Sequence, residues 1–178
     1  MKTLVIFDFD DTLFESKSQI VVRSPRFGTK YLTSGEYASF VPEADDELDF
    51  SQFEGYPPDI KPIQATVRRL RNAVMKHGLD NVIILTARSN STPIQQVLRD
   101  FRLPAIYVAA VGSSNPATKA EYTVRTVTEE EYNRVELFED NVRNIVAIRE
   151  AIVPIVGQKN FVAYNVRQAS TGHSLVRH

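Results

Sequence analysis

The sequence of 178 residues predicts an α/β fold in which helices flank a parallel β-sheet. Two observations lead to this prediction. Short apolar segments rich in β-branched and aromatic residues recur along the chain, and polar residues follow each of them, as is typical of buried parallel strands. The segments between them have helical periodicity, and alternating strands and helices indicate parallel pairing through right-handed crossovers.

The predicted strands number about five and are spread over the whole chain. The first, residues 3–7, is a continuous apolar run that ends at Asp8. Parallel strands buried on both faces have this uninterrupted apolar character. The other segments share its short length and its polar C-terminal end; they are residues 82–85, 106–111, 135–138 and 161–164.

The predicted helices have recognisable start and end signals. Residues 63–77 repeat apolar side chains on one helical face and end before Gly78, a suitable C-cap. Further starts are predicted at Ser91 before residues 94–101, at Asn115 before a helix from Ala117, and at the capping-box spacing of Thr128 and Glu131; the last helix covers residues 142–152.

Residues 15–59, between the first strand and the first helix, lack this periodicity and contain seven of the 17 aromatic residues of the chain. Basic residues come first in the segment and acidic residues follow. A structureless loop of this length is uncommon in a compact domain, so we expect a small inserted cap over the carboxyl ends of the strands. Its aromatic residues are expected to form a small core, and one or two of them could instead stack on a base.

These features divide the chain into a core domain of residues 1–14 and 60–166, the inserted cap of residues 15–59, and a C-terminal tail. The tail, residues 167–178, is polar, and we expect it to be frayed.

Composition excludes several functional classes. The apolar content of 43% and charged content of 24% are those of an ordinary soluble domain, and a net charge of −1 argues against nucleic-acid binding through bulk electrostatics. Without cysteine the chain has no disulfide or thiolate chemistry, which fits the cytoplasm. The apolar run near the N-terminus is too short for a signal peptide, and no segment approaches the roughly 20 apolar residues that span a bilayer. We therefore expect a cytoplasmic protein with no membrane association.

Two carboxylates follow the first predicted strand. Asp8 and Asp10 are two residues apart, so in an extended chain they point to the same side, roughly 7 Å from each other. Acids that converge at the mouth of an apolar core repel each other and are costly to desolvate, and a divalent cation would relieve that cost. One carboxylate could then act as a nucleophile and the other as a proton shuttle.

The other predicted strands bring further polar groups to the same edge of the sheet, where ligands bind in α/β proteins. Each of these groups is suited to binding a phosphate or a metal. They are Thr12 after the first strand, Thr86 and Arg88 after the second, Lys119 in the first turn of the helix after the third, and Glu139 and Asp140 after the fourth, with Asn144 one helical turn later.

In order along the chain, the segment Asp8–Leu13, Thr86, Lys119 and the pair Glu139-Asp140 resemble the four motifs of the haloacid dehalogenase (HAD) superfamily of phosphatases. The resemblance covers residues 1 to about 150, and the whole chain looks like small phosphatase-like proteins of bacteriophages. It implies a three-layer Rossmann-like parallel sheet with a small cap inserted after the first strand. For a phage protein, the compartment would be the cytoplasm of the host.

The resemblance also implies roles for single residues. Asp8 would attack phosphorus and carry an aspartyl-phosphate, and Asp10 would protonate the leaving oxygen and then deprotonate the attacking water. Thr86 would bind a phosphoryl oxygen, and Lys119 would neutralise charge on the phosphoryl group and on Asp8. Thr12 is expected to bind substrate.

Mg²⁺ is the implied cofactor, because the candidate ligands are hard oxygen donors without histidine or cysteine. The implied ligands are Asp8, the backbone carbonyl of Asp10, and Asp140, with Glu139 and Asn144 acting directly or through water. The sequence departs from many relatives at Asp11, where glycine is frequent, and at Glu139, where the family often has aspartate or glycine. Asp140 could also be the N-cap of the last helix, and Arg88 could bind substrate or form a structural ion pair.

The leading hypothesis is a Mg²⁺-dependent phosphatase that hydrolyses a small phosphomonoester. A nucleotide or a nucleic-acid end is the favoured substrate class, because of the phage-like resemblance and the basic and aromatic residues of the cap. One alternative is a binding protein that retains the fold without turnover. Another is a receiver domain, although its middle strands should then deliver an acceptor aspartate, whereas here they end at Thr86 and Gly112. The sequence makes no prediction about the oligomeric state.

Overall fold

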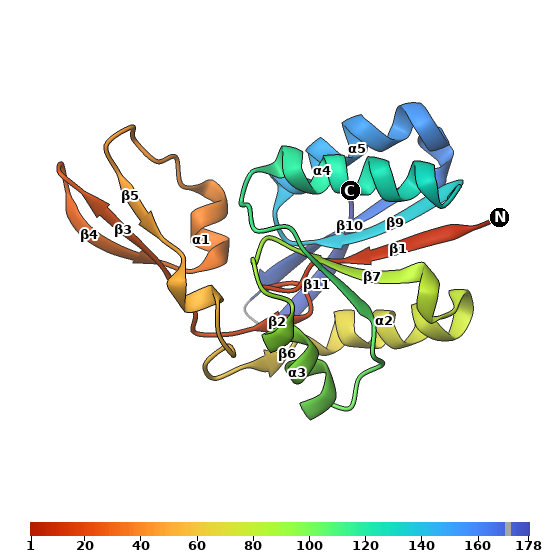
Figure 1. Cartoon of the computed structure of the whole chain (residues 1–178), viewed down its shortest axis with the longest axis horizontal. Helices are drawn as coiled ribbons and strands as arrows, with labels where there is room; N and C mark the ends of the chain where they lie inside the picture. The colour runs from red at the N-terminus through yellow and green to blue at the C-terminus, as the bar shows by residue number, and fades with distance from the viewer. Residues whose placement is uncertain (170–171) are drawn as a thin grey trace.

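A six-stranded, mostly parallel sheet forms the centre of the fold in the computed structural model, which describes residues 1–169 and 172–178 (Figure 1). All five predicted strands are confirmed and pair in parallel. The strand order is β11-β10-β9-β1-β7-β8, which places the first strand of the chain inside the sheet. The strands are β1 (Thr3–Phe7), β7 (Val82–Thr86), β8 (Tyr107–Ala110), β9 (Arg134–Glu139), β10 (Phe161–Ala169) and β11 (Gly172–Arg177).

Helices cover both faces of this sheet (Figure 1). Alternate residues of β1 pack into two different apolar clusters, because successive side chains of a strand point to opposite faces. Val5 and Phe7 belong to the cluster that includes residues of α2 and α3, whereas Leu4 and Ile6 belong to the one with residues of α4 and α5. The helices are α2 (Gln64–His77), α3 (Thr92–Asp100), α4 (Pro116–Glu129) and α5 (Val142–Val156). Among the helices described, none has the length and apolar character needed to cross a membrane.

The helix boundaries follow most of the predicted signals. Gly78 caps α2 with φ at +84°, a backbone conformation that favours glycine, and the Asn115 side chain caps α4. The N-cap of α5 is Asn141, whose side chain accepts from Arg143 N, and not Asp140. The predicted helix start at Thr128 is wrong, because this residue lies in the last turn of α4.

The residues between β1 and α2 form a separate antiparallel sheet with a short helix beside it (Figure 1). We call residues 15–59 the insertion. At its base, Phe14 pairs with Pro62 and Glu15 with Lys61, so the insertion leaves and re-enters the core at adjacent positions. Its elements and those at its base are β2 (Phe14–Glu15), β3 (Ile20–Ser24), β4 (Gly28–Leu32), α1 (Ser34–Ser39), β5 (Glu47–Asp49), the 3-10 turn Ser51–Phe53 and β6 (Lys61–Pro62).

The insertion has a small apolar core of its own. Its central strand β3 buries Ile20 and Val22, and it pairs with β4 on one side and β5 on the other. Aromatic rings pack against one another beside this sheet: the ring centroids of Tyr37 and Phe50 are 5.4 Å apart, and those of Phe27 and Phe40 are 6.5 Å apart. Residues 15–59, which show no helical periodicity in the sequence, therefore form a folded unit.

The predicted frayed tail, residues 167–178, is wrong for the part of it that the structure describes. β10 continues to Ala169, and β11 returns antiparallel to it, from Gly172 opposite Ala169 to Arg177 opposite Tyr164. Residues 170 and 171 of the predicted tail lie outside the described residues. An antiparallel edge strand can leave one face in water, so a polar sequence is compatible with the pairing. Leu175 of β11 packs against the apolar cluster that includes residues of α2.

Candidate functional site

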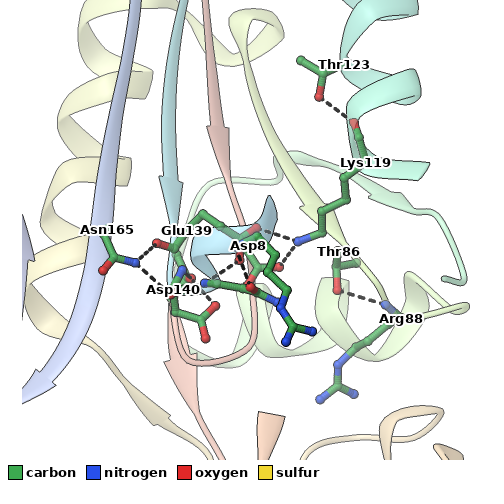
Figure 2. A network of polar contacts seen from close by, with 11 residues as sticks. Asp8, Thr86, Arg88, Lys119, Thr123, Glu139, Asp140 and Asn165 are labelled. Atoms are coloured by element: carbon green, nitrogen blue, oxygen red, sulfur yellow. Dashed lines mark hydrogen bonds and ion pairs between the residues drawn. The ribbon is translucent and has the colours of Figure 1, made fainter. Parts of the chain in front are cut away.

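Three adjacent strands end at the site. In the order β9-β1-β7, the parallel strands deliver Glu139, Asp8 and Thr86 to the same edge of the sheet (Figure 2). The Asp8 amide donates to the carbonyl of Phe138 (3.0 Å), which continues the pairing between β1 and β9 up to the first acid. The common edge predicted from the sequence is confirmed.

An acidic cluster lies at this edge. Asp8, Glu139 and Asp140 each offer a carboxylate oxygen, and these three atoms lie within 4.8 Å of one another. Asp8 and Glu139 are 6% and 1% exposed, so they have little water with which to share their charge. Carboxylates this close and this buried need a compensating cation.

Lys119 of α4 supplies part of that positive charge. Its Nζ donates to Asp8 Oδ1 (2.7 Å) and to Glu139 Oε2 (2.8 Å), and its side chain is 3% exposed (Figure 2). One helical turn later, Thr123 Oγ1 donates to the Lys119 carbonyl (2.8 Å). The ammonium thus bridges the ends of β1 and β9.

One ammonium group does not neutralise three carboxylates. The raised pKa values of the acids show this excess of negative charge. Burial, followed by repulsion from Glu139, raises the pKa of Asp8 to about 7, even though the charge of Lys119 opposes both effects. Burial, then Glu139 and Asp8, likewise raise the pKa of Asp140. Burial alone would lower the pKa of Lys119, but Asp8 and Glu139 outweigh it and raise that pKa. The cluster carries more negative charge than its own lysine compensates.

The cluster fits a hard divalent cation. Its ligands are all carboxylate oxygens, which suit Mg²⁺. Neighbouring groups also hold the acids in place: Asn165 Nδ2 donates to the Asp140 carbonyl (2.8 Å) and the Glu139 carbonyl (3.2 Å), and the Asn141 amide donates to Glu139 Oε1 (3.1 Å). Such supporting bonds fix ligand orientation in metal sites.

Thr12 has a different partner from the one expected. It was predicted to bind substrate, but it is completely buried. Its Oγ1 donates to Asp140 Oδ1 (3.3 Å) and accepts from the Asp140 amide (3.1 Å). Thr12 therefore orients Asp140 and does not reach the substrate space.

Arg88 forms the structural ion pair that was one of its two predicted roles. Its Nε and Nη2 donate to Asp10 Oδ2 (2.9 Å) and Oδ1 (2.8 Å), and Nη1 donates to the carbonyls of Phe53 (2.8 Å) and Gly55 (3.2 Å). All three guanidinium nitrogens are thus bonded within the protein. This arrangement places the Asp10 carboxylate beside the acidic cluster, not within it. Arg88 also lines the neighbouring cavity, and its contact with substrate stays a prediction.

Thr86 lies next to Arg88 at the end of β7. Its Oγ1 accepts from the Arg88 amide (3.2 Å), and a hydroxyl that accepts in this way keeps a proton that it can donate to another acceptor (Figure 2). The residue is 1% exposed, so only a ligand seated deep against the strand end would reach it.

A cavity of about 410 Å³ lies between these groups and the insertion. Its core wall includes Asp8, Asp10, Lys119 and Asn144, and the opposite wall includes aromatic side chains of the insertion. The residues of that opposite wall are Ile20, Ser34, Tyr37, Phe50, Phe53 and Glu54. A second, larger cavity of about 940 Å³ meets the site at Ser34 and Asp140 from the other side, and side chains of both charges line it.

Two features of the site were missed in the sequence. Asn165 of β10 supports both Glu139 and Asp140 through their backbone carbonyls. It directly follows a predicted strand, and polar residues at that position of the other strands were the signal that could have identified it. Asp11 has φ at +56°, a left-handed backbone conformation that favours glycine and that few other residues adopt. The Asp11 carboxylate accepts a hydrogen bond from Ser34 of the insertion.

The structure therefore brings Asp8, Lys119, Glu139 and Asp140 into direct contact or close proximity, with Asp10 in the same cavity wall and Thr86 at the end of the adjacent strand β7. Comparison of the chain with protein-family models, with curated proteins and with solved structures finds no match. Interpretation of the site consequently depends on the residues and the geometry given above.

Proposed function

We propose that this protein is a Mg²⁺-dependent phosphatase that hydrolyses a phosphomonoester through a phosphoryl group carried on Asp8. The observation that supports it most is the buried contact of Lys119 with both Asp8 and Glu139, beside a cavity open to a ligand. The proposal includes the finer fold assignment, a three-layer Rossmann-like core with the insertion acting as a cap over the carboxyl ends of the strands.

In this proposal Asp8 attacks phosphorus through a carboxylate oxygen, and the bond from phosphorus to the ester oxygen breaks. Asp10, which lines the same cavity, gives the leaving oxygen its proton. Water then attacks the phosphorus of the aspartyl-phosphate, Asp10 takes a proton from it, and phosphate leaves with Asp8 regenerated. Thr86 donates its free hydroxyl proton to a phosphoryl oxygen, and Lys119 keeps Asp8 oriented for attack.

Asp8, Asp140 and Glu139 would hold the cation, together with the predicted backbone carbonyl of Asp10. When bound, Mg²⁺ neutralises charge on the phosphoryl oxygens and on the acids around it. Thr12 and Asn165 keep Asp140 in place for this role through the hydrogen bonds described above.

The cavity supports a substrate with one phosphate and a planar leaving group. Among the described residues that line it, Arg88 and Lys119 carry the positive charges, and both are already paired with acids. A second phosphate would have no cation left to bind. Phe50, which is 36% exposed, and Tyr37 face the cavity from the insertion and offer aromatic surfaces on which a base could stack. Of the expected substrate classes, a nucleoside monophosphate fits better than a nucleic-acid end.

The test is phosphate release from a panel of nucleoside mono- and diphosphates, phosphorylated oligonucleotides and sugar phosphates, with and without Mg²⁺. We expect Mg²⁺-dependent turnover that Asp8→Asn abolishes, with nucleoside monophosphates turned over best. Phe50→Ala should raise KM for a nucleotide and leave KM for a sugar phosphate unchanged. Absence of turnover above the Asp8→Asn variant for every compound would contradict the phosphatase proposal.

A further inference from the structure

One side chain joins the candidate proton-transfer residue to the insertion. The guanidinium of Arg88 binds both carboxylate oxygens of Asp10 on one side and the carbonyls of Phe53 and Gly55 on the other. Its carbon Cζ also lies 5.1 Å from the ring centroid of Phe53 and 5.4 Å from that of Phe9. Only 1% of the side chain is exposed.

The backbone of Arg88 belongs to the core and does not follow the insertion. Its amide donates to Thr86 Oγ1 (3.2 Å), and its carbonyl accepts from the Gly112 amide (3.0 Å). The guanidinium is planar and its donors form a rigid fork. If Phe53 and Gly55 moved away, Nη1 would lose its two carbonyl acceptors, and the guanidinium would turn toward other acceptors.

We propose that Arg88 is a positioning residue that couples the docking of the insertion to the orientation of the Asp10 carboxylate. With Phe53 and Gly55 docked, the fork holds Asp10 in a fixed orientation at the cavity wall. With the insertion withdrawn, the fork turns and Asp10 loses that orientation, so proton transfer occurs only when the cavity is covered. The part concerning proton transfer rests on the proposed function.

A second contact between insertion and core provides a matched control. Ser34 of α1 donates to the Asp11 carboxylate, and this bond involves neither Arg88 nor Asp10. Ser34→Ala therefore removes a tie of the insertion without touching the proposed coupling. An effect seen both in Ser34→Ala and in the Arg88 variants would therefore come from weaker attachment of the insertion in general, and not from the proposed coupling.

The first experiment needs no turnover: amide hydrogen exchange of residues 50–56 in Arg88→Gln, Asp10→Ala, the double variant and Ser34→Ala. We expect both single variants to exchange about 10- to 100-fold faster there, as when hydrogen bonds to a charged group are lost. The double variant should be no faster than the faster single variant, and Ser34→Ala should match the wild type. Normal exchange in Asp10→Ala with faster exchange in Arg88→Gln would overturn the coupling.

The second experiment compares leaving groups, since p-nitrophenolate departs without a proton whereas an alkoxide needs one. We expect Arg88→Gln to lower kcat for an alkyl phosphate about 10- to 100-fold more than for p-nitrophenyl phosphate, within the usual range for general acid catalysis. In the Asp10→Ala background the same substitution should cause no further loss. Arg88→Lys, which keeps the charge but not the fork, serves as a second variant if Arg88→Gln does not fold.

Equal loss of kcat for both leaving groups would overturn the positioning role. If the wild type hydrolyses no phosphomonoester, the proposed function fails, and with it the proton-transfer part of this inference. The exchange experiment still decides whether Arg88 couples Asp10 to the insertion, so the two failures are distinguishable.

Discussion

At the scale of single residues, the charge of Lys119 is needed where three carboxylates meet. Removal of one partner of a buried ion pair leaves an uncompensated charge and typically costs about 3–5 kcal/mol. We therefore expect Lys119→Met to lower the free energy of unfolding in urea by about that amount at pH 8. The loss should be smaller at pH 5, where Asp8 is largely protonated.

Lys76→Met serves as the control for this measurement, because Lys76 is exposed on α2. We expect it to change the unfolding free energy little at either pH. An equal, pH-independent loss in both lysine variants would show that the effect comes from side-chain length and not from the acids around Lys119.

The pKa of Asp8 predicts how stability varies with pH. Folding raises this pKa from about 3.9 to about 7, so the folded protein holds a proton that the unfolded chain has released. In the absence of divalent cations, the stability due to this group is complete below about pH 4 and is lost as the pH rises through about 7. Asp140, whose pKa is also raised, acts in the same direction.

The proposed Mg²⁺ would bind the ionised carboxylates, so it should raise the midpoint of thermal unfolding more at pH 8 than at pH 5. Differential scanning calorimetry with Mg²⁺ and with a chelator measures the difference. Asp8→Asn should reduce it. The same increase at both pH values would contradict the site proposed for the cation.

Thr12 offers a residue-scale test of ligand orientation. Thr12→Val keeps the shape of the side chain but removes both hydrogen bonds to Asp140. We expect Mg²⁺ affinity, measured by calorimetric titration, to fall about 10- to 100-fold, the usual effect of losing such a supporting group. Thr12→Ser, which keeps the hydroxyl, should bind the ion as the wild type does. Unchanged affinity in Thr12→Val would contradict the orienting role.

At the scale of secondary-structure elements, the sequence predicted those elements whose signals are local. The apolar run of β1 is enough to predict a buried strand, and the glycine after α2 is enough to predict where that helix ends. The polar sequence of β11 contains no such signal, because β11 pairs with the preceding strand β10 at the sheet edge and its apolar contact is with α2, far away in the sequence. The start signal at Thr128 was misleading for a related reason: a local spacing predicts a helix start only where the chain is not already helical.

The pairing of β11 can be tested at one residue. Leu175 is half-buried against the cluster that contains residues of α2. Leu175→Ala should lower the free energy of unfolding by about 1–2 kcal/mol, less than for a fully buried leucine. The neighbouring Val176 is 40% exposed, so Val176→Ala should change it little. No effect in either variant would indicate a frayed C-terminal segment after all.

At the scale of the whole molecule, the sequence predicted which residues meet but not what each of them touches. Asp8, Lys119 and Asp140 were expected at one edge because parallel strands share the direction of their ends, and the topology confirms it. Thr12 was assigned to the substrate and Arg88 to the substrate or to a structural ion pair, and the partners that both show are protein groups. The carbonyls of Phe53 and Gly55 could not be foreseen, because the fold of the insertion has no periodic signal in its sequence.

The two ends of the insertion lie side by side, because Glu15 and Lys61 are paired across β2 and β6. The path of the chain in the core is therefore the one it would have if a tight turn joined Glu15 directly to Lys61. Lengthening, shortening or exchanging everything beyond that junction need not shift the register of β1 or the start of α2. A foreign segment grafted at residues 15 and 61 should therefore leave the central sheet intact, although it would remove the carbonyls of Phe53 and Gly55 that Arg88 binds.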